Sequence, residues 1–303
     1  MRLSKIYAIL TFILVSTCLH CGKASEADLV VTLHINESRI FVNMPVEVEV
    51  CVSNTSSGVI SVLPVRCGSR NVEDEWYGTL ELVVVFNKVE YRSRYLKLWF
   101  GPIKEIESLR PPEPVRLGAG QKICNRFILG GKWFWEEKYN DSLFDKPGSY
   151  EVRLIYYPFI KEENGRWNID KSRFVKSDKV MIDVTDTGDK DRECWEAIRK
   201  VPIWYLIYDP ELRCVRYIRP PSLRTEIAES FRVLAEKYSD SIYRDLLLYT
   251  SAGLQIVMDE KQVAEKKEAI EVLRRLANED KFIYRVYARQ LLESKSLSSG
   301  MSR

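Results

Sequence analysis

The cysteines and histidines are the side chains of this 303-residue chain best suited to redox or metal chemistry. Two histidines are present, and His34 is the one beyond residue 24. Five cysteines lie beyond residue 24: Cys51, Cys67, Cys124, Cys194 and Cys214. None of the five is spaced Cys-x-x-Cys, the spacing typical of zinc and redox sites. The sequence therefore predicts no metal and no cofactor.

Disulfide bonds are the alternative chemistry for these thiols, since cysteines pair outside the reducing cytosol. In the run from Val46 to Val52 the valines alternate with glutamates, which places Cys51 on the glutamate face of a strand. Cys124 lies between Lys122 and Arg126 on the polar face of another strand. If the two strands are neighbours, Cys51 and Cys124 bridge on an outer face, and Cys194 with Cys214 is a second, local pair. The sequence leaves open that all five stay reduced.

Aromatic residues form the densest candidate binding segment. Alternation places Trp133 and Trp135 on one side of a strand, with Tyr139 a few residues later. Exposed tryptophans would stack on a sugar or anchor a partner protein, whereas buried ones would close one end of the fold. Neighbouring Glu136 and Glu137 point apart in a strand, so they cannot flank a glycosidic bond. Because the sequence also lacks a recognisable set of nucleophile, base and orienting group, we predict a non-enzymatic protein.

The N-terminus has the pattern of an export signal. Arg2 and Lys5 precede an apolar run over Ile6–Val15, too short for a stable membrane span, and small residues place cleavage after Ala24 or Ala27. We expect a signal over residues 1–24 and a periplasmic, cell-surface or secreted protein. Lipid attachment at Cys18, which would anchor the protein to a membrane, is the alternative.

Charge excludes one class of partner. The chain has 46 basic and 43 acidic residues, and three basic residues, Arg2, Lys5 and Lys23, belong to the expected signal. The remaining chain is balanced, with 43 basic residues against 43 acidic ones. We therefore expect no nucleic-acid partner, since phosphate binding needs a basic surface.

Residues 28–186 have a period of two interrupted by turn residues, which predicts an antiparallel β-sandwich. The expected strands are Leu29–Ile35, Arg39–Val42, Pro45–Ser53, Val59–Val65, Thr79–Asn87, Tyr95–Phe100, Lys122–Leu129, Ser149–Tyr157 and Lys179–Val184. The turn residues 54–58 predict a hairpin between two of them, and the prolines of 110–114 cannot continue a sheet.

Asp145, Gly148 and Tyr150, spaced in this way before a strand, resemble the tyrosine corner of immunoglobulin-like domains. That resemblance implies a Tyr150 hydroxyl bonded to the backbone upstream. Val152 stands where antibody domains have a cysteine, so the inter-sheet disulfide of those domains is absent here. Residues 115–121 before one strand and 147–150 before another are also similar to exported bacterial Ig-like domains, including the proteinase-inhibitor type BsuPI.

After residue 186 the period becomes helical. Four aspartates in residues 183–191 lack the order of an EF-hand loop and predict a linker with a helix N-cap. We expect short helices over 187–221, then helices at Ser222–Tyr238, Ser241–Met258, Lys261–Ala277 and Lys281–Glu293, and a disordered tail over 296–303. Residues 273–292 resemble the paired helices of HEAT or tetratricopeptide repeats, which implies a protein-binding surface.

The predicted fold class is β + α in two domains, an antiparallel Ig-like β-sandwich over 28–186 and a small antiparallel helical domain over 222–295. The predicted function is an exported binding or scaffold protein with a protein partner. Two alternatives remain: a proteinase inhibitor acting through the loop Pro102–Pro114, and a polysaccharide-binding module acting through Trp133 and Trp135.

Overall fold

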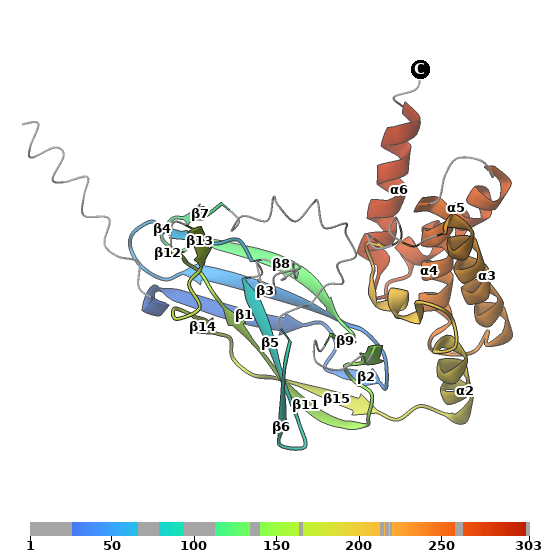
Figure 1. Ribbon diagram of the computed structural model, residues 1–303, viewed down its shortest axis with the longest axis horizontal. Coiled ribbons are helices and arrows are strands. Elements are labelled where there is room, and N and C mark those ends of the chain that lie inside the picture. Colours follow the sequence, from blue (N-terminus) through green and yellow to red (C-terminus); the bar gives the residue numbers. More distant parts are fainter. Residues whose placement is uncertain are drawn as a thin grey trace, which may run out of the picture.

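The computed structural model of the protein describes residues 26–65, 79–93, 113–133, 140–163, 166–212, 215, 218, 220–257 and 263–300. They form a β-sandwich followed by a group of helices at one end of it (Figure 1). The predicted export signal, with Cys18, lies outside the described residues. Within these ranges, every helix is too short or too polar to span a bilayer.

The first sheet of the sandwich is antiparallel, with strand order β1-β3-β8. Its strands are β1 (Leu29–Ile35), β3 (Val46–Asn54) and β8 (Lys122–Leu129). Alternation along β3 turns Val48, Val50 and Val52 inward, and all three are buried. The bounds of β1 and β8 are those predicted from the period of the sequence.

The second sheet has strand order β2-β15-β11-β5-β6, with β14 beside β11. Its strands are β2 (Arg39–Phe41), β5 (Leu80–Phe86), β6 (Val89–Ser93), β11 (Gly148–Tyr156), β14 (Val175–Lys176) and β15 (Val180–Thr185). Inward residues such as Leu82 and Leu154 share one apolar core with the β3 valines. Two sheets that face each other across a common core are a β-sandwich, as the sequence predicted.

One strand pair departs from the antiparallel prediction. Residues 36–38 carry the chain from β1 in the first sheet to β2 in the second, where β2 pairs with β15 in parallel. The period of two indicates which side chains face the core, but it does not indicate the direction of a neighbouring strand.

The hairpin predicted over residues 54–58 is wrong. β3 pairs with β1 and β8, whereas β4 (Ile60–Val62) pairs with β7 (Val115–Leu117), so the turn moves the chain out of the first sheet. The Asn54 amide donates hydrogen bonds to the carbonyls of Gly58 and Leu117 (2.7 and 3.0 Å). These bonds tie the end of β3 to the turn and to β7 instead of to a hairpin partner.

Short ribbons complete the β part. They are β4 with β7, β9 (Gly131–Trp133) with β10 (Asn140–Ser142), and β12 (Ile160–Glu163) with β13 (Arg166–Ile169). Strands of three or four residues are too short to show a period, so most of these were missed. The strand predicted at 95–100 lies outside the described residues.

Tyr150 has the geometry of a tyrosine corner. Its hydroxyl donates to the Lys146 carbonyl (3.0 Å) and accepts from the Lys146 N–H (3.2 Å). The ring is buried, stacks on Phe86 and meets Phe144 edge to face. Burial raises the pKa of Tyr150 to about 12, so the hydroxyl stays protonated and remains a donor. The upstream backbone bond implied by the resemblance is confirmed.

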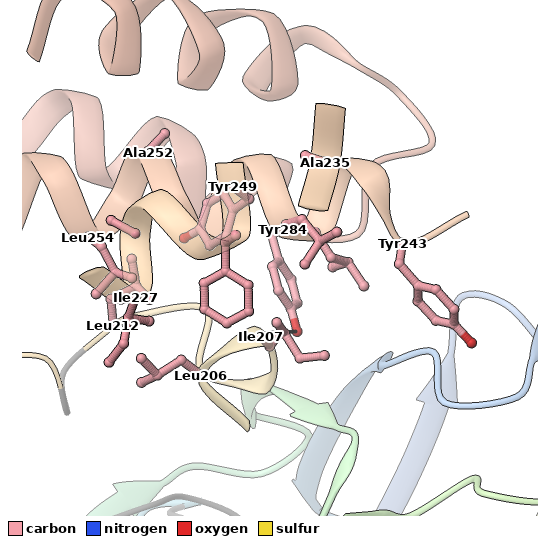
Figure 2. Close-up of a cluster of buried hydrophobic side chains, with 14 of the residues drawn as sticks. Leu206, Ile207, Leu212, Ile227, Ala235, Tyr243, Tyr249, Ala252, Leu254 and Tyr284 are labelled. Atoms are coloured by element: carbon pink, nitrogen blue, oxygen red, sulfur yellow. Dashed lines mark hydrogen bonds between the residues drawn. The ribbon is translucent and has the colours of Figure 1, made fainter. Parts of the chain in front are cut away.

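The helical part packs its helices in the order of the chain. Its elements are α2 (Asp189–Ile198), the 3₁₀ helix η3 (Trp204–Tyr208), α3 (Pro221–Lys237), α4 (Arg244–Val257), α5 (Val263–Asn278) and α6 (Arg285–Gly300); a 3₁₀ turn, η1 (Glu26–Asp28), precedes β1. Each of α3 to α6 packs against the next. Their shared core includes Leu206, Ile207 and Tyr249 (Figure 2). The disordered tail predicted from residue 296 is wrong as far as Gly300, because α6, which contains no proline, continues to that residue.

Buried tyrosines join the helical part to the sandwich. The Tyr208 hydroxyl donates to the Asn43 carbonyl (2.8 Å), and the Tyr243 hydroxyl donates to the Val42 carbonyl (2.6 Å). Tyr243 points from the helical part toward the turn between β2 and β3 (Figure 2). Trp195 contacts both tyrosine rings. These contacts fix the helices against one end of the sandwich.

Candidate binding cleft at the junction

A cleft lies where the outer face of the first sheet meets the turn between α5 and α6. It consists of two adjoining hollows of about 400 Å³ and 310 Å³ that share Glu47, Arg126 and Val286. We call this surface the junction cleft. The larger hollow falls within the range of roughly 300–1,000 Å³ that small ligands and inserted side chains occupy.

The two walls of the junction cleft come from distant parts of the sequence. Alternation along β3 turns Glu47 and Glu49 outward, on the face opposite the valine core. Arg126 on β8 stands directly across from Glu49 in the antiparallel register. The other wall is the first turn of α6, with Arg285 and Val286. Tyr284, just before α6, donates a hydrogen bond to the Ile207 carbonyl (2.7 Å) and so ties this wall to η3, which Tyr208 joins to the sandwich.

Each of the two arginines of the cleft, Arg126 and Arg285, forms an ion pair. Arg126 Nε lies 3.1 Å from Glu49 Oε1, and Arg285 Nη1 lies 2.9 Å from Asp280 Oδ1. Both pairs are partly exposed, so each contributes about 1 kcal/mol or less to folding. In the cleft, the positive charge of each arginine is balanced by the carboxylate that pairs with it.

Glu47 differs from Glu49 and Asp280, the acids of the cleft that pair with its arginines. Its carboxylate accepts a hydrogen bond from the Asn36 side chain (2.8 Å), and among the described residues no cation lies within ion-pair distance of it. Burial raises the pKa of Glu47, and the positive charges of Arg126 and Arg285 offset only part of that increase. Glu47 is thus a partly desolvated carboxylate at the centre of the cleft.

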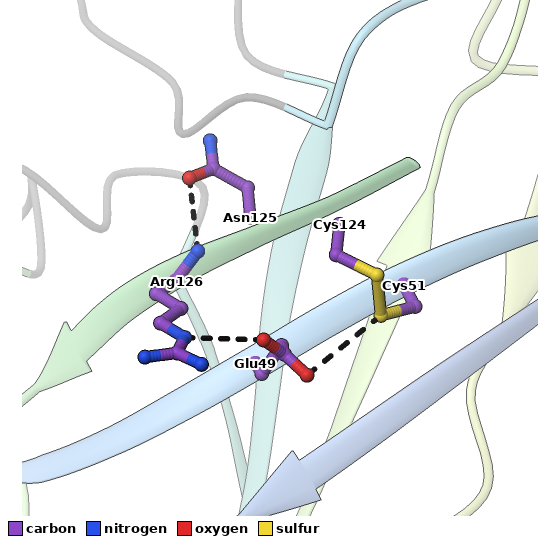
Figure 3. The surroundings of a disulfide bond; sticks show 5 residues. All are labelled: Glu49, Cys51, Cys124, Asn125 and Arg126. Atoms are coloured by element: carbon purple, nitrogen blue, oxygen red, sulfur yellow. Dashed lines mark hydrogen bonds and ion pairs between the residues drawn. A yellow bond between two sulfur atoms is a disulfide. The ribbon is translucent and has the colours of Figure 1, made fainter. Parts of the chain in front are cut away.

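The disulfide predicted between Cys51 and Cys124 is present, on the sheet face that forms one wall of the cleft (Figure 3). The two cysteines stand opposite each other in the β3–β8 register, with Cα atoms 4.1 Å apart. That spacing is close to the roughly 4.5 Å of non-hydrogen-bonded antiparallel pairs, which brings the side chains together. Although Glu49 lies beside them, neither sulfur offers a thiolate to a metal ion, since both are in the bond.

The second predicted disulfide is not formed. Cys194 is a free thiol, buried in the helical core, and burial raises its pKa. It lies on α2, whose buried face fixes its side chain among helices. Cys214, its predicted partner, and Cys67 lie outside the described residues. The Cys194–Cys214 bond was predicted because the two residues are close in the sequence, and that proximity does not determine which cysteines meet in the fold.

The aspartates of residues 183–191 accept hydrogen bonds or form ion pairs. Asp191 accepts hydrogen bonds from the Ser241 hydroxyl (2.8 Å) and the Ile242 N–H (3.1 Å), in the turn that precedes α4. Asp189 pairs with Arg192 in the first turn of α2. The predicted side-chain N-cap is wrong, because Gly188, which has no side chain to accept a hydrogen bond, precedes α2.

Other predicted binding residues cannot be compared with the structure. Trp135, Tyr139 and the loop over 102–112 lie outside the described residues, and the side chain of Trp133 does so as well. His34 lies exposed on β1, across from Glu49.

Sequence reasoning missed the cleft as a whole. The alternation around Cys51 places Glu47 and Glu49 outward, and the polar pattern of β8 does the same for Arg126. Nothing in that pattern indicates that the start of α6 covers this face. The contact depends on the position of the helical part relative to the sheet.

Comparison with known proteins gives weak structural matches. No family model and no curated protein matches the chain. Among solved structures, the CARDB domain of the PF1109 protein from Pyrococcus furiosus, in complex with di-metal ions, is 16% identical, with a TM-score of 0.24, covering 53% of this chain and 94% of that domain. The sporulation control protein Spo0M from Bacillus subtilis is 14% identical, with a TM-score of 0.26, covering 57% of this chain and 55% of that protein. Similarities of this size have no bearing on function.

Proposed function

We propose that the protein is an exported, non-enzymatic binding or scaffold protein that recognises a protein partner through the junction cleft. The observation that carries this proposal is that both parts of the fold contribute to the cleft. Glu47 and Arg126 come from the sandwich, whereas Arg285 and Val286 come from α6.

The way the walls are held supports this proposal. Hydrogen bonds from Tyr208 and Tyr243 to backbone carbonyls of the sandwich are buried, and buried hydrogen bonds are costly to break. The cleft therefore keeps its shape before a partner arrives. A preorganised surface loses less conformational entropy on binding than a mobile one.

The order of the helices is also in keeping with a protein partner. α3 to α6 stack one after another, each against the next, an arrangement similar to that of repeat proteins. In the part of the chain that the structure describes, these four helices are too few for an extended repeat surface. We therefore assign recognition to the junction cleft, with the helical part as one of its walls.

Export completes the proposal. The N-terminal sequence predicts a cleaved signal, or a lipid at Cys18 that would anchor the protein to a membrane. The mass of the intact protein from its native host separates the two, because a lipidated chain would begin at Cys18 and keep Cys21.

A photo-cross-linker inside the cleft tests the function. Gln290 lines the smaller hollow and is exposed, so a benzophenone side chain fits there. Glu268, an exposed residue of α5, is the matched control position. After illumination in the native envelope, we expect a protein adduct from position 290 and none from 268. Adducts from neither position, or equal adducts from both, would contradict the proposal.

A further inference from the structure

The junction cleft contains more negative than positive groups. Its carboxylates are those of Glu37, Glu47, Glu49, Glu211 and Asp280. Its cations are those of Arg126, Lys281 and Arg285. This imbalance favours a basic ligand, because complementary charge steers association and selects partners.

The positions of the charges strengthen the preference of the cleft for a basic ligand. Arg126 and Arg285 each have a bound carboxylate, in Glu49 and Asp280 respectively. Glu47 has the neutral amide of Asn36 as its partner, so its negative charge is not cancelled by direct pairing. At Arg126 or Arg285 an anionic ligand would have to displace an existing carboxylate, and beside Glu47 it would meet a negative charge, whereas a cation meets an acceptor that is already oriented.

Apolar groups line the same hollow as Glu47. Pro45 and Val46 contribute from the sheet side, and Phe282, Ile283 and Val286 contribute from the helix side. Lysine and arginine have an apolar stem and a charged head, and they bury the stem while the head stays in contact with polar groups. The hollow therefore offers both parts of such a side chain a complementary surface.

We propose that the junction cleft binds a lysine or arginine side chain of an extended segment of the partner, with the Glu47 carboxylate as its ion-pair partner. This inference rests on the proposed function and adds the chemistry of what is recognised. Asn36 is a positioning residue, because its amide holds the Glu47 carboxylate.

A binding role and a structural role for Glu47 predict opposite effects on stability. A partly desolvated carboxylate without a cation costs folding free energy, so replacing it with glutamine removes that cost. The glutamine side chain keeps a carbonyl oxygen that accepts the Asn36 hydrogen bond. Thus Glu47→Gln should leave the melting temperature unchanged or higher, whereas loss of a structural ion pair would lower it.

Selection of peptides from a random library displayed on phage tests the inference with the full protein. We expect wild-type protein to enrich peptides that contain lysine or arginine. Glu47→Gln should weaken the binding of a selected peptide about tenfold or more, the usual effect of losing a charged hydrogen bond. The matched control Glu268→Gln, which changes net charge equally on α5, should bind as wild type does.

Several outcomes would overturn the inference. Selected peptides that lack lysine and arginine, peptides rich in acidic residues, or equal affinity of wild type and Glu47→Gln would refute the cation site. Those results would leave the cleft as a peptide-binding surface, so the proposed function would survive. A Glu47→Gln variant with a lowered melting temperature would assign Glu47 a structural role. Absence of any enriched peptide, together with no cross-linked adduct from position 290, would overturn both proposals.

Discussion

Loss of the Cys51–Cys124 disulfide should destabilise the sandwich by about 4 kcal/mol. The bond joins residues separated by 73 positions. A cross-link that closes a loop of that length removes chain entropy from the unfolded state equivalent to about 4.4 kcal/mol at 25 °C. Native disulfides of small exported domains typically contribute roughly 2–5 kcal/mol, which brackets this value.

Guanidinium denaturation of wild-type protein and of the Cys51→Ala/Cys124→Ala variant measures this loss. Hydrogen exchange of peptides that cover β3 and β8 assigns it to the sandwich, while peptides from α3 to α6 report on the helical core. Wild-type protein treated with a reductant is the matched control and should behave like the variant, since Cys194, the other cysteine that the structure describes, is already a free thiol. A difference below about 1 kcal/mol between oxidised and reduced wild type would refute the entropic argument.

Three further changes test the junction and the charge of Glu47. Tyr243→Phe leaves the buried Val42 carbonyl without its donor and should lower the free energy of unfolding by about 1–3 kcal/mol in chemical denaturation; an unchanged midpoint would contradict the bond. Gly130→Ala places a Cβ against the Tyr208 ring and should cost about 1–3 kcal/mol, with exchange accelerated around the β2–β3 turn; wild-type stability would show that the ring moves freely. Because burial raises the pKa of Glu47 in the folded state, its contribution to stability falls as pH rises through that pKa. The melting temperature of Glu47→Gln should therefore exceed that of wild type more at neutral than at acidic pH, and a constant difference would contradict the raised pKa.

Local patterns predicted the elements that bury one face. β1 has the predicted bounds because its apolar residues alternate over seven positions, whereas β8 combines a mostly polar first half with three buried apolar residues at its end. The same alternation placed Cys51 and Cys124 on outward faces, so their pairing followed once the strands were neighbours. Tyr150 was identified by its spacing from Gly148, a local geometry that needs no distant contact.

Long-range relations were not predictable from such patterns. The parallel pairing of β2 with β15, and the path of the chain after Asn54, depend on which sheet accepts each strand. Cys194 is near Cys214 in the sequence, yet α2 buries its thiol in a helical core. The junction cleft likewise depends on where α6 starts relative to the sheet.

The most direct measurement of the central claim is a double-mutant cycle between Glu47 and the basic residue of a selected peptide. Calorimetry would give the affinity of the peptide, and of its counterpart with norleucine in place of lysine, for wild type and for Glu47→Gln. A direct ion pair in the cleft predicts a coupling energy of about 1.4 kcal/mol or more, the equivalent of the tenfold loss, so the norleucine peptide should barely distinguish the two proteins. Additivity within about 0.5 kcal/mol would contradict the claim that Glu47 binds the cation.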